Sequence, residues 1–265
     1  MSVDKNDSKP KAKVTTSITK IEPDKITIKG YNQNDLIDKL SYPEMVYLLL
    51  KGELANEKDL KIFNHILVSF ADHGLTPPST QTARLIGTSG SPLNVCLSGA
   101  FLSFGKYHAG AIEGAMDLFQ NSIKSMDSVD DEAINKMAID IVNHFKNNKK
   151  NIPGFGHRYH KEDPRASKIL SLAIEEGFVS NHTKLAIAIE EQLQEKNVKM
   201  NIDGINGAIL SDMGFSSEAG FGIFMIGRIP GLIAHVIEQS NNGEIFKKLF
   251  DFDEISYIGE ENKEL

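Results

Sequence analysis

The run IPGFGHRYHKEDPRA at residues 152–166 concentrates side chains that move protons and bind anions. His157 carries an imidazole that can gain or lose a proton near neutral pH. Arg158 and Arg165 carry planar guanidinium groups, which bind carboxylates through paired hydrogen bonds. These residue types, so close together, predict a site for proton transfer on an anionic substrate.

The first half of this run is a loop that can receive a ligand. It consists of Pro153, Gly154, Phe155 and Gly156. Its glycines allow a ligand to approach backbone N–H groups closely. Asp163 and Pro164 then predict a helix start, with Asp163 as N-cap, which places Arg165 in the first turn.

Two other interpretations of this run stay open from the residues alone. A glycine-rich loop before a capped helix is common in proteins without any site, and its arginines can simply face solvent. His157 and His160 have the HxxH spacing of a zinc site. We expect no metal, because no third ligand stands at a suitable spacing and the chain has one cysteine.

Four more residues elsewhere in the chain are candidates, each with a structural alternative. His73 is expected in the last turn of a helix, where the helix dipole would stabilise its cation. His108 precedes a helix start, where the dipole favours the neutral imidazole, unless it is an exposed loop residue. Asp203 could be only an N-cap. Arg228 lies in an apolar helix and needs an anionic partner, either a carboxylate of the protein or a ligand.

Composition narrows the class of protein. The chain has 265 residues, a hydrophobic content of 40% and a net charge of −7, so it can bury a large core and is a poor nucleic-acid binder. The single Cys96 excludes a disulfide framework and fits a reducing compartment, so we expect a cytoplasmic protein. The apolar segment 219–236 contains Arg228 and four glycines, which favours a buried helix over a membrane span.

The elements that must position these residues are almost all helical. Residues 15–29 alternate around Glu22-Pro23-Asp24-Lys25 and predict a β-hairpin, expected to be the only sheet. Ser41 and Glu44 predict a capping box, and Gly52 a helix end. Further helices are expected near residues 56–74, 79–88, 92–104, 111–124, 131–147, 164–176, 181–195, 203–213 and 217–238.

Taken together, the motifs resemble the citrate synthase family. They are GYNQNDLIDKLSYPEMVYLLLKGEL, ADHG (71–74), HAGA (108–111), GFGHR, DPRA, NIDG (201–204) and GRIPGLIAH (227–235), in the family's order. The resemblance covers nearly the whole chain from about residue 15. Compared with full-length synthases, helical material before ADHG is missing, and the chain looks closer to compact citryl-CoA lyases and the C-terminal lyase module of ATP-citrate lyase.

The resemblance implies a role for each candidate residue. Asp203 would be the base that takes a proton from the methyl group of acetyl-CoA, and neutral His108 would hydrogen-bond the thioester oxygen. His157 would polarise the keto oxygen of oxaloacetate. His73, Arg158, Arg165 and Arg228 would bind this acid, and the Pro153, Gly154, Phe155 and Gly156 loop would lie against coenzyme A.

The resemblance also implies an architecture. We expect an all-α, citrate-synthase-like fold with a large and a small helical domain and a short N-terminal β-hairpin. The expected parts are a disordered tail at 1–14, large-domain helices at 15–150, a small domain at 151–215 carrying GFGHR and NIDG, and a return to the large domain at 216–265.

The implied function is cleavage of citryl-CoA to acetyl-CoA and oxaloacetate, with the CoA thioester as substrate and no permanently bound cofactor. Asp203 followed by Gly204 favours a lyase, whereas the retained His108 is typical of a synthase. The alternatives are a compact citrate or 2-methylcitrate synthase and a non-catalytic CoA-binding or scaffold subunit. We expect a homodimer or larger homo-oligomer, possibly with a separate citryl-CoA synthetase as partner, and no nucleic acid or membrane.

Overall fold

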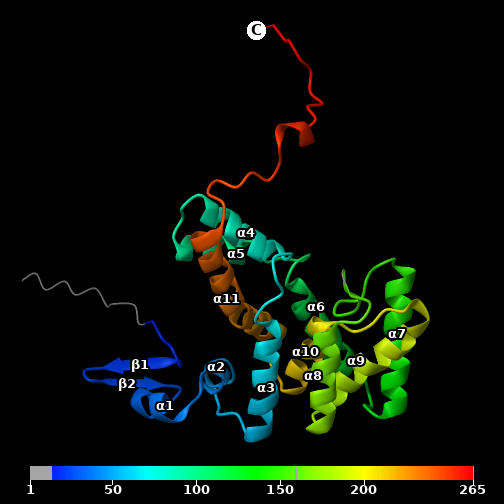
Figure 1. Ribbon diagram of the computed structural model, residues 1–265. Coiled ribbons are helices and arrows are strands. Elements are labelled where there is room, and N and C mark those ends of the chain that lie inside the picture. The colour runs from blue at the N-terminus through cyan, green and yellow to red at the C-terminus, as the bar shows by residue number, and fades with distance from the viewer. Residues whose placement is uncertain (1–13, 159, 265) are drawn as a thin grey trace, which may run out of the picture. The chain divides into compact units, whose positions relative to one another are not determined.

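The computed structural model describes residues 14–158 and 160–264 (Figure 1). The chain divides into two compact units, residues 1–64 and 65–265. The predicted tail at 1–14 lies outside the described residues except for Val14, which is exposed. Within the described residues the secondary structure is helical apart from one small sheet, which confirms the predicted all-α class.

The first unit begins with a three-stranded antiparallel sheet in the order β1-β2-β3. Its strands are β1 (Thr19–Glu22), β2 (Lys25–Ile28) and β3 (Tyr31–Asn32). The predicted hairpin is confirmed: Glu22 pairs with Lys25 across a turn in which Asp24 has a φ of 57°. The third strand was not predicted, because two residues show no alternation.

Two helices complete the core of this unit. The helix α1 (Gln33–Lys39), which the sequence did not predict, starts at Asn32, whose side chain accepts the N–H of Asn34. The helix α2 (Tyr42–Lys51) carries the predicted capping box and ends at Gly52 in the left-handed conformation. Ile28, Leu36 and Leu48 form the buried cluster between sheet and helices. The next helix, α3 (Glu57–Phe70), contains the boundary between the two units.

The second unit consists of helices that the sequence predicted to within a few residues at each end. They are α4 (Pro78–Thr88), α5 (Leu93–Leu102), α6 (Gly110–Lys124), α7 (Asp131–Asn147), α8 (Pro164–Glu175), α9 (Asn181–Gln192), α10 (Ile202–Asp212) and α11 (Ser217–Asn242). Two short 3-10 helices, η1 (Gln194–Lys196) and η2 (Phe252–Glu254), follow α9 and α11.

The helix α10 is the centre of this unit (Figure 1). It packs against α6, α8 and α9, and every residue from 204 to 211 is buried. The helix α11 packs against α4, α5 and α6, and α7 packs against α9. The predicted division into large and small domains stays a prediction, but the helices that carry the candidate site residues all meet around α6, α10 and α11.

By length and composition, α11 could cross a membrane. In this fold it is a core helix: nearly half of its most apolar window is buried against neighbouring helices, and it carries the buried Arg228. Pro230 lies inside α11, and the N–H of the next residue, Gly231, donates to the carbonyl of Ala71. A membrane span is therefore not needed to explain its apolar sequence.

Candidate active site

Asp203 does not cap α10, which corrects one sequence expectation. The N-cap is Asn201, whose side-chain oxygen accepts the N–H of Asp203 at 3.0 Å and that of Gly204 at 3.1 Å. Asp203 therefore lies inside the first turn, and its carboxylate is not used for capping. Its Oδ1 is buried and accepts no hydrogen bond from the described residues. Such an atom is costly to leave without a partner unless a ligand uses it.

The surroundings of Asp203 make its carboxylate a stronger base than an ordinary aspartate. Burial raises the pKa of Asp203 to about 6, although Arg165 and Arg228 lower it, and Asp163 adds to the rise. At pH 7 the group is still mostly ionised and can take a proton. A positioned carboxylate with a pKa close to neutrality is typical of a general base.

Asp163 organises the cationic part of the site. It is 1% exposed, and it holds Arg165 through two hydrogen bonds, Nε to Oδ1 at 3.1 Å and Nη2 to Oδ2 at 2.9 Å. Its Oδ2 also accepts the N–H of Ile202 at 3.2 Å. The sequence predicted only the N-cap role, which is confirmed, because the link from α8 to the start of α10 depends on tertiary structure. The guanidinium of Arg165 is thus fixed beside Asp203.

Arg228 is buried in α11, and its charge is not paired with a carboxylate among the described residues. Its Nε donates to the carbonyl of Phe70 at 2.7 Å, and its guanidinium carbon lies 5.1 Å from the centre of the Phe224 ring. One carbonyl and one aromatic face orient this cation but do not neutralise it. Of the two partners expected from the sequence, a ligand anion is therefore the better supported.

His73 lies in a different place from the one predicted. The helix α3 ends at Phe70, so His73 belongs to the following turn and not to a helix end. Burial lowers the pKa of His73 to about 4, and Arg165 and Arg228 lower it further. The imidazole is neutral at pH 7, contrary to the expected cation, because it is buried and because two guanidinium groups act on it.

His157 stands beside His73, with the ring centres 5.5 Å apart. Its Nδ1 accepts the backbone N–H of His160 at 3.2 Å, so the neutral ring carries its proton on Nε2. Burial lowers the pKa of His157, Asp163 raises it, and His160 and Arg165 lower it. Among the described residues, no group of three or more His, Cys, Asp or Glu side chains is arranged to hold a metal ion.

His108 is held in one tautomer by Ser79, which the sequence did not single out. The backbone N–H of Ser79 donates to Nε2 of His108 at 3.3 Å, and the Ser79 hydroxyl lies 2.9 Å from the same atom. The neutral ring therefore carries its proton on Nδ1. Burial lowers the pKa of His108 to about 4, with help from Arg228 and Arg158. The neutral form was expected, but burial and not the dipole of α6 is its main cause.

Arg158 lies at the exposed edge of this cluster, where its Nη2 donates to the carbonyl of Tyr107 at 3.1 Å. The contact joins the loop after GFGH to the loop that carries His108. Its charge acts on that imidazole, so Arg158 belongs to the same cluster of charged and polar groups.

The candidate residues converge on two guanidinium groups. The charges of Arg165 and Arg228 both act on Asp203 and on His73. Arg228 also acts on His108, and Arg165 on His157. Because such interactions weaken with distance, the carboxylate and the three imidazoles lie near the same pair of guanidinium groups. Phe104 contacts His108, Phe221 and Phe224, and these phenylalanine rings form an apolar wall beside His108.

The sequence suggested that the N–H groups of the glycine loop are available to a ligand. In the structure some of them are bonded within the protein, and the loop packs against α10. Gly156 donates to the carbonyl of Lys199 at 2.7 Å, and Phe155 donates to Ile152. Gly154 has a φ of +83°, and a Cβ there would lie 2.6 Å from the Cα of Gly204. The two glycines therefore let the loop lie directly against the turn that carries Asp203.

A lysine-rimmed cavity of about 120 Å³ adjoins this loop. Phe155, Ile152 and Val198 contribute apolar walls, together with Val142, Phe145 and Leu193. The lysines at its edge are Lys146, Lys150 and Lys196. An apolar cavity with several cations at its rim suits a ring system that carries phosphates. Of the four loop residues predicted to bind the CoA moiety, only Phe155 lines this cavity.

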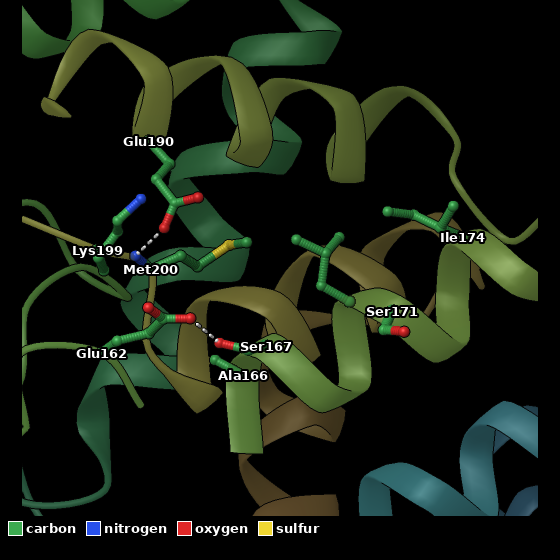
Figure 2. A pocket seen from close by; sticks show the side chains of 9 residues that line it. Glu162, Ala166, Ser167, Ser171, Ile174, Glu190, Lys199 and Met200 are labelled. Atoms are coloured by element: carbon green, nitrogen blue, oxygen red, sulfur yellow. Dashed lines mark hydrogen bonds between the residues drawn. The ribbon is translucent and has the colours of Figure 1, made fainter. Parts of the chain in front are cut away.

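A second cavity, of about 270 Å³, opens between α8 and α9 (Figure 2). None of the predicted site residues lines it. Two of its polar pairs are internally bonded: the Ser167 hydroxyl donates to Glu162 at 2.6 Å, and the Met200 N–H donates to Glu190 at 2.8 Å. We therefore assign no ligand to this cavity.

Comparison with known proteins decides the family. Residues 11–68 and 55–248 match the family described as citrate synthase, C-terminal domain. The chain belongs to the citrate synthase family. The citryl-CoA lyase structure from Hydrogenobacter thermophilus is 36% identical, with a TM-score of 0.84, covering 95% of this chain and 97% of that one.

Two other similar proteins are longer than this chain. The citrate synthase of Heyndrickxia coagulans is 33% identical over 80% of this chain and 56% of its own, so the chain spans about half the length of this curated relative. The ATP citrate lyase of Methanosaeta concilii, in a complex with (3S)-citryl-CoA, has a TM-score of 0.80 at 23% identity, covering 95% of this chain and 42% of that one. This last likeness shows the fold alone. The family therefore contains both lyases and synthases, which are enzymes.

Proposed function

We propose that this protein cleaves citryl-CoA to acetyl-CoA and oxaloacetate through an enolate of acetyl-CoA. The observation that carries the proposal is Asp203, a buried carboxylate with a raised pKa and an Oδ1 without a partner among the described residues. The charges of Arg165 and Arg228, which can bind carboxylates, act on Asp203. Both arginines also act on the neutral imidazole of His73, and Arg228 acts on that of His108. The similarity to a citryl-CoA lyase structure, at 36% identity and a TM-score of 0.84, supports the lyase over the synthase.

Each group has a defined task in cleavage. As the citryl hydroxyl loses its proton to water, that carbon becomes the ketone of oxaloacetate, and the Nε2–H of neutral His157 donates a hydrogen bond to the ketone oxygen. The bond between this carbon and the methylene carbon of the thioester breaks, and its electron pair forms the enolate. His108 donates a hydrogen bond from Nδ1 to the enolate oxygen, and protonated Asp203 then delivers a proton to the enolate carbon. In the reverse direction, Asp203 removes this proton.

The oxo-acid is bound by groups that stay in place during this step. Arg165 and Arg228 bind its carboxylates, and His73 donates a hydrogen bond to the same acid. Arg165 is already oriented by Asp163, and Arg228 by Phe70 and Phe224. Arg158, at the exposed edge, meets the outer part of the substrate. Fixed cations of this kind hold the ketone while the enolate forms.

We assign the CoA moiety to the lysine-rimmed cavity beside the glycine loop. Replacing both Lys150 and Lys196 by Glu is expected to raise KM for citryl-CoA about tenfold, or ~1.4 kcal/mol, without changing kcat. The reason is repulsion of the CoA phosphates at the cavity rim. Lys136→Glu, an exposed change on α7 outside the cavity, is the matched control. Equal KM values for the two variants would contradict the assignment.

Product analysis separates the three functions considered. Purified protein is incubated with citryl-CoA, and in parallel with acetyl-CoA plus oxaloacetate. A lyase releases acetyl-CoA and oxaloacetate from citryl-CoA. A citrate or 2-methylcitrate synthase instead releases free CoA rapidly from an acyl-CoA and oxaloacetate, and this result would refute the lyase. No turnover in either reaction would favour the non-catalytic CoA-binding subunit, and the intact set of site residues argues against that outcome.

A homo-oligomer is the assembly that the exposed apolar surface supports. Large apolar side chains of the segment after α11 are at least 60% exposed: Ile245, Phe246, Leu249, Phe250, Phe252, Ile255, Tyr257 and Ile258. The helix α5 also exposes Leu93, Val95 and Leu102. Exposed apolar surface of this extent marks an interaction site, and a second copy would cover both patches. The substrates are soluble, so we propose that the protein acts in the cytoplasm, supplied by a separate citryl-CoA synthetase.

Deleting residues 245–265 tests the oligomer. Full-length protein is expected to elute as a dimer or larger species by size-exclusion chromatography with light scattering. The deletion is expected to shift it toward the monomer, because most of the exposed apolar side chains are removed. A monomeric full-length protein, or an unchanged oligomer after deletion, would contradict this assignment.

A further inference from the structure

Residues 70–74, the end of α3 and the turn that carries His73, are held against one face of α11 at three successive points. The contacts are Arg228 Nε to the Phe70 carbonyl at 2.7 Å, the Gly231 N–H to the Ala71 carbonyl at 3.1 Å, and His235 Nε2 to Asp72 Oδ1 at 2.9 Å. The spacing of three and four residues between these points follows one side of a helix. The helix α11 therefore holds both an anion-binding arginine and the turn that presents His73.

The Asp72 side chain bonds both to the backbone of this turn and to α11. Its Oδ2 accepts the N–H of Gly74 at 3.1 Å, while its Oδ1 faces Nε2 of His235. One carboxylate thus fixes the backbone after His73 and links it to α11. Burial raises the pKa of Asp72, but the hydrogen bonds from Gly74 and His235 outweigh it and the pKa lies below its usual value. The ionised carboxylate can only accept, so Nε2 of His235 is the donor.

The contact has little room for adjustment. Gly231 lies directly under the turn, and a Cβ at this position would meet the Ala71 carbonyl and lie 2.9 Å from Asp72 Oδ1. On the outer side, Arg84 donates to the carbonyl of His235 at 3.2 Å and to Glu238 at 2.7 Å. Arg84, on α4, therefore holds the backbone of α11 at His235, while the His235 ring holds the turn.

We propose that Asp72 and His235 are positioning residues that set His73 relative to Arg228, so that both reach the same oxo-acid. The proposal rests on the proposed function, because it assumes that these two groups bind oxaloacetate. Neither Asp72 nor His235 touches the substrate. Loss of the contact between Asp72 and His235 releases the turn and weakens binding of the oxo-acid, whereas the CoA moiety is bound as before.

The test is oxaloacetate binding by calorimetry to the full chain and to His235→Ala, His235→Gln and Ile237→Ala. Ile237→Ala removes a half-exposed side chain from the same helix and is the matched control. We expect the Kd of oxaloacetate to rise about tenfold in His235→Ala. In His235→Gln it should return to within about threefold, because the Gln amide can donate to Asp72. The Kd of acetyl-CoA should stay the same throughout.

Three results would overturn the positioning role: an unchanged oxaloacetate Kd in His235→Ala, an equal loss for both ligands, or no rescue by Gln. Thermal unfolding of each variant shows whether the protein is folded during the measurement. If the unaltered protein does not bind oxaloacetate at all, the proposed function itself fails. That outcome is distinct from the case in which the unaltered protein binds and the variant binds equally well.

Discussion

Asp203→Asn is expected to lower kcat for citryl-CoA cleavage on the order of a hundredfold or more, with little change in KM. Asn has nearly the same shape but cannot deliver or remove a proton. The substrate contacts made by the arginines and histidines are left in place, so binding should persist. The measurement is steady-state kinetics of acetyl-CoA and oxaloacetate release. Turnover close to that of the unaltered protein would contradict the role of Asp203.

The same substitution should make the protein more stable at neutral pH. The folded-state pKa of Asp203, about 6, exceeds its ordinary value of 3.8, so its ionisation costs folding free energy that is fully present above pH 6 and vanishes below pH 4. Asp203→Asn is therefore expected to raise the free energy of unfolding by about 1–3 kcal/mol at pH 8 and to change it little at pH 4. Urea unfolding at the two pH values measures this difference.

Asp212→Asn is the matched control, and its expected effect on the free energy of unfolding is opposite. Asp212 lies on the same helix and accepts hydrogen bonds from the start of α9, from the N–H and Nδ1 of His182 and from the N–H and Oγ1 of Thr183. Burial raises the pKa of Asp212, but these bonds outweigh it and hold the pKa below its usual value. Asp212→Asn should lower stability at pH 8, with the loss fading as the pH falls through the folded-state pKa. The same substitution at two aspartates of α10 is thus expected to raise stability at pH 8 for Asp203 and to lower it for Asp212.

His108→Ala is expected to lower kcat by about 10²- to 10³-fold, the loss typical of removing one donor to a developing oxyanion. Burial holds the pKa of His108 at about 4, so it acts as a neutral donor across the working range. No loss of activity from its titration should therefore appear above pH 5. The check is a pH profile of kcat for the unaltered protein together with the kinetics of the variant.

His182→Ala is the control for loss of an imidazole outside the site, because His182 pairs with Asp212 at 2.8 Å. It should lower stability while leaving kcat of the folded protein unchanged. Equal losses of kcat in the two variants would mean that the effect of His108→Ala comes from the fold and not from the reaction.

The helices and the glycine loop could be predicted because their signals are local. The capping box at Ser41, the N-cap at Asp163 and the apolar periodicity of α3 to α11 each depend on residues a few positions apart. The helix α1 was missed because seven residues carry too little periodicity. The strand β3 has only two residues and gives no alternation at all.

The site could be predicted by residue type but not by environment. Asp203 was expected as a possible cap, yet Asn201 two residues earlier takes that role. The neutral form of His73 depends first on its burial and then on Arg165 and Arg228, which come from helices distant in sequence. Ser79 and His235 act through contacts that span 29 and 163 residues, so no local pattern could identify them.

The most direct measurement is exchange of the methyl protons of acetyl-CoA in D2O, followed by proton NMR in the presence of oxaloacetate. We expect the unaltered protein to catalyse this exchange, because Asp203 removes the proton and His108 stabilises the enolate, and we expect Asp203→Asn not to catalyse it. Absence of exchange in the unaltered protein, or equal exchange in both proteins, would contradict enolate chemistry at Asp203.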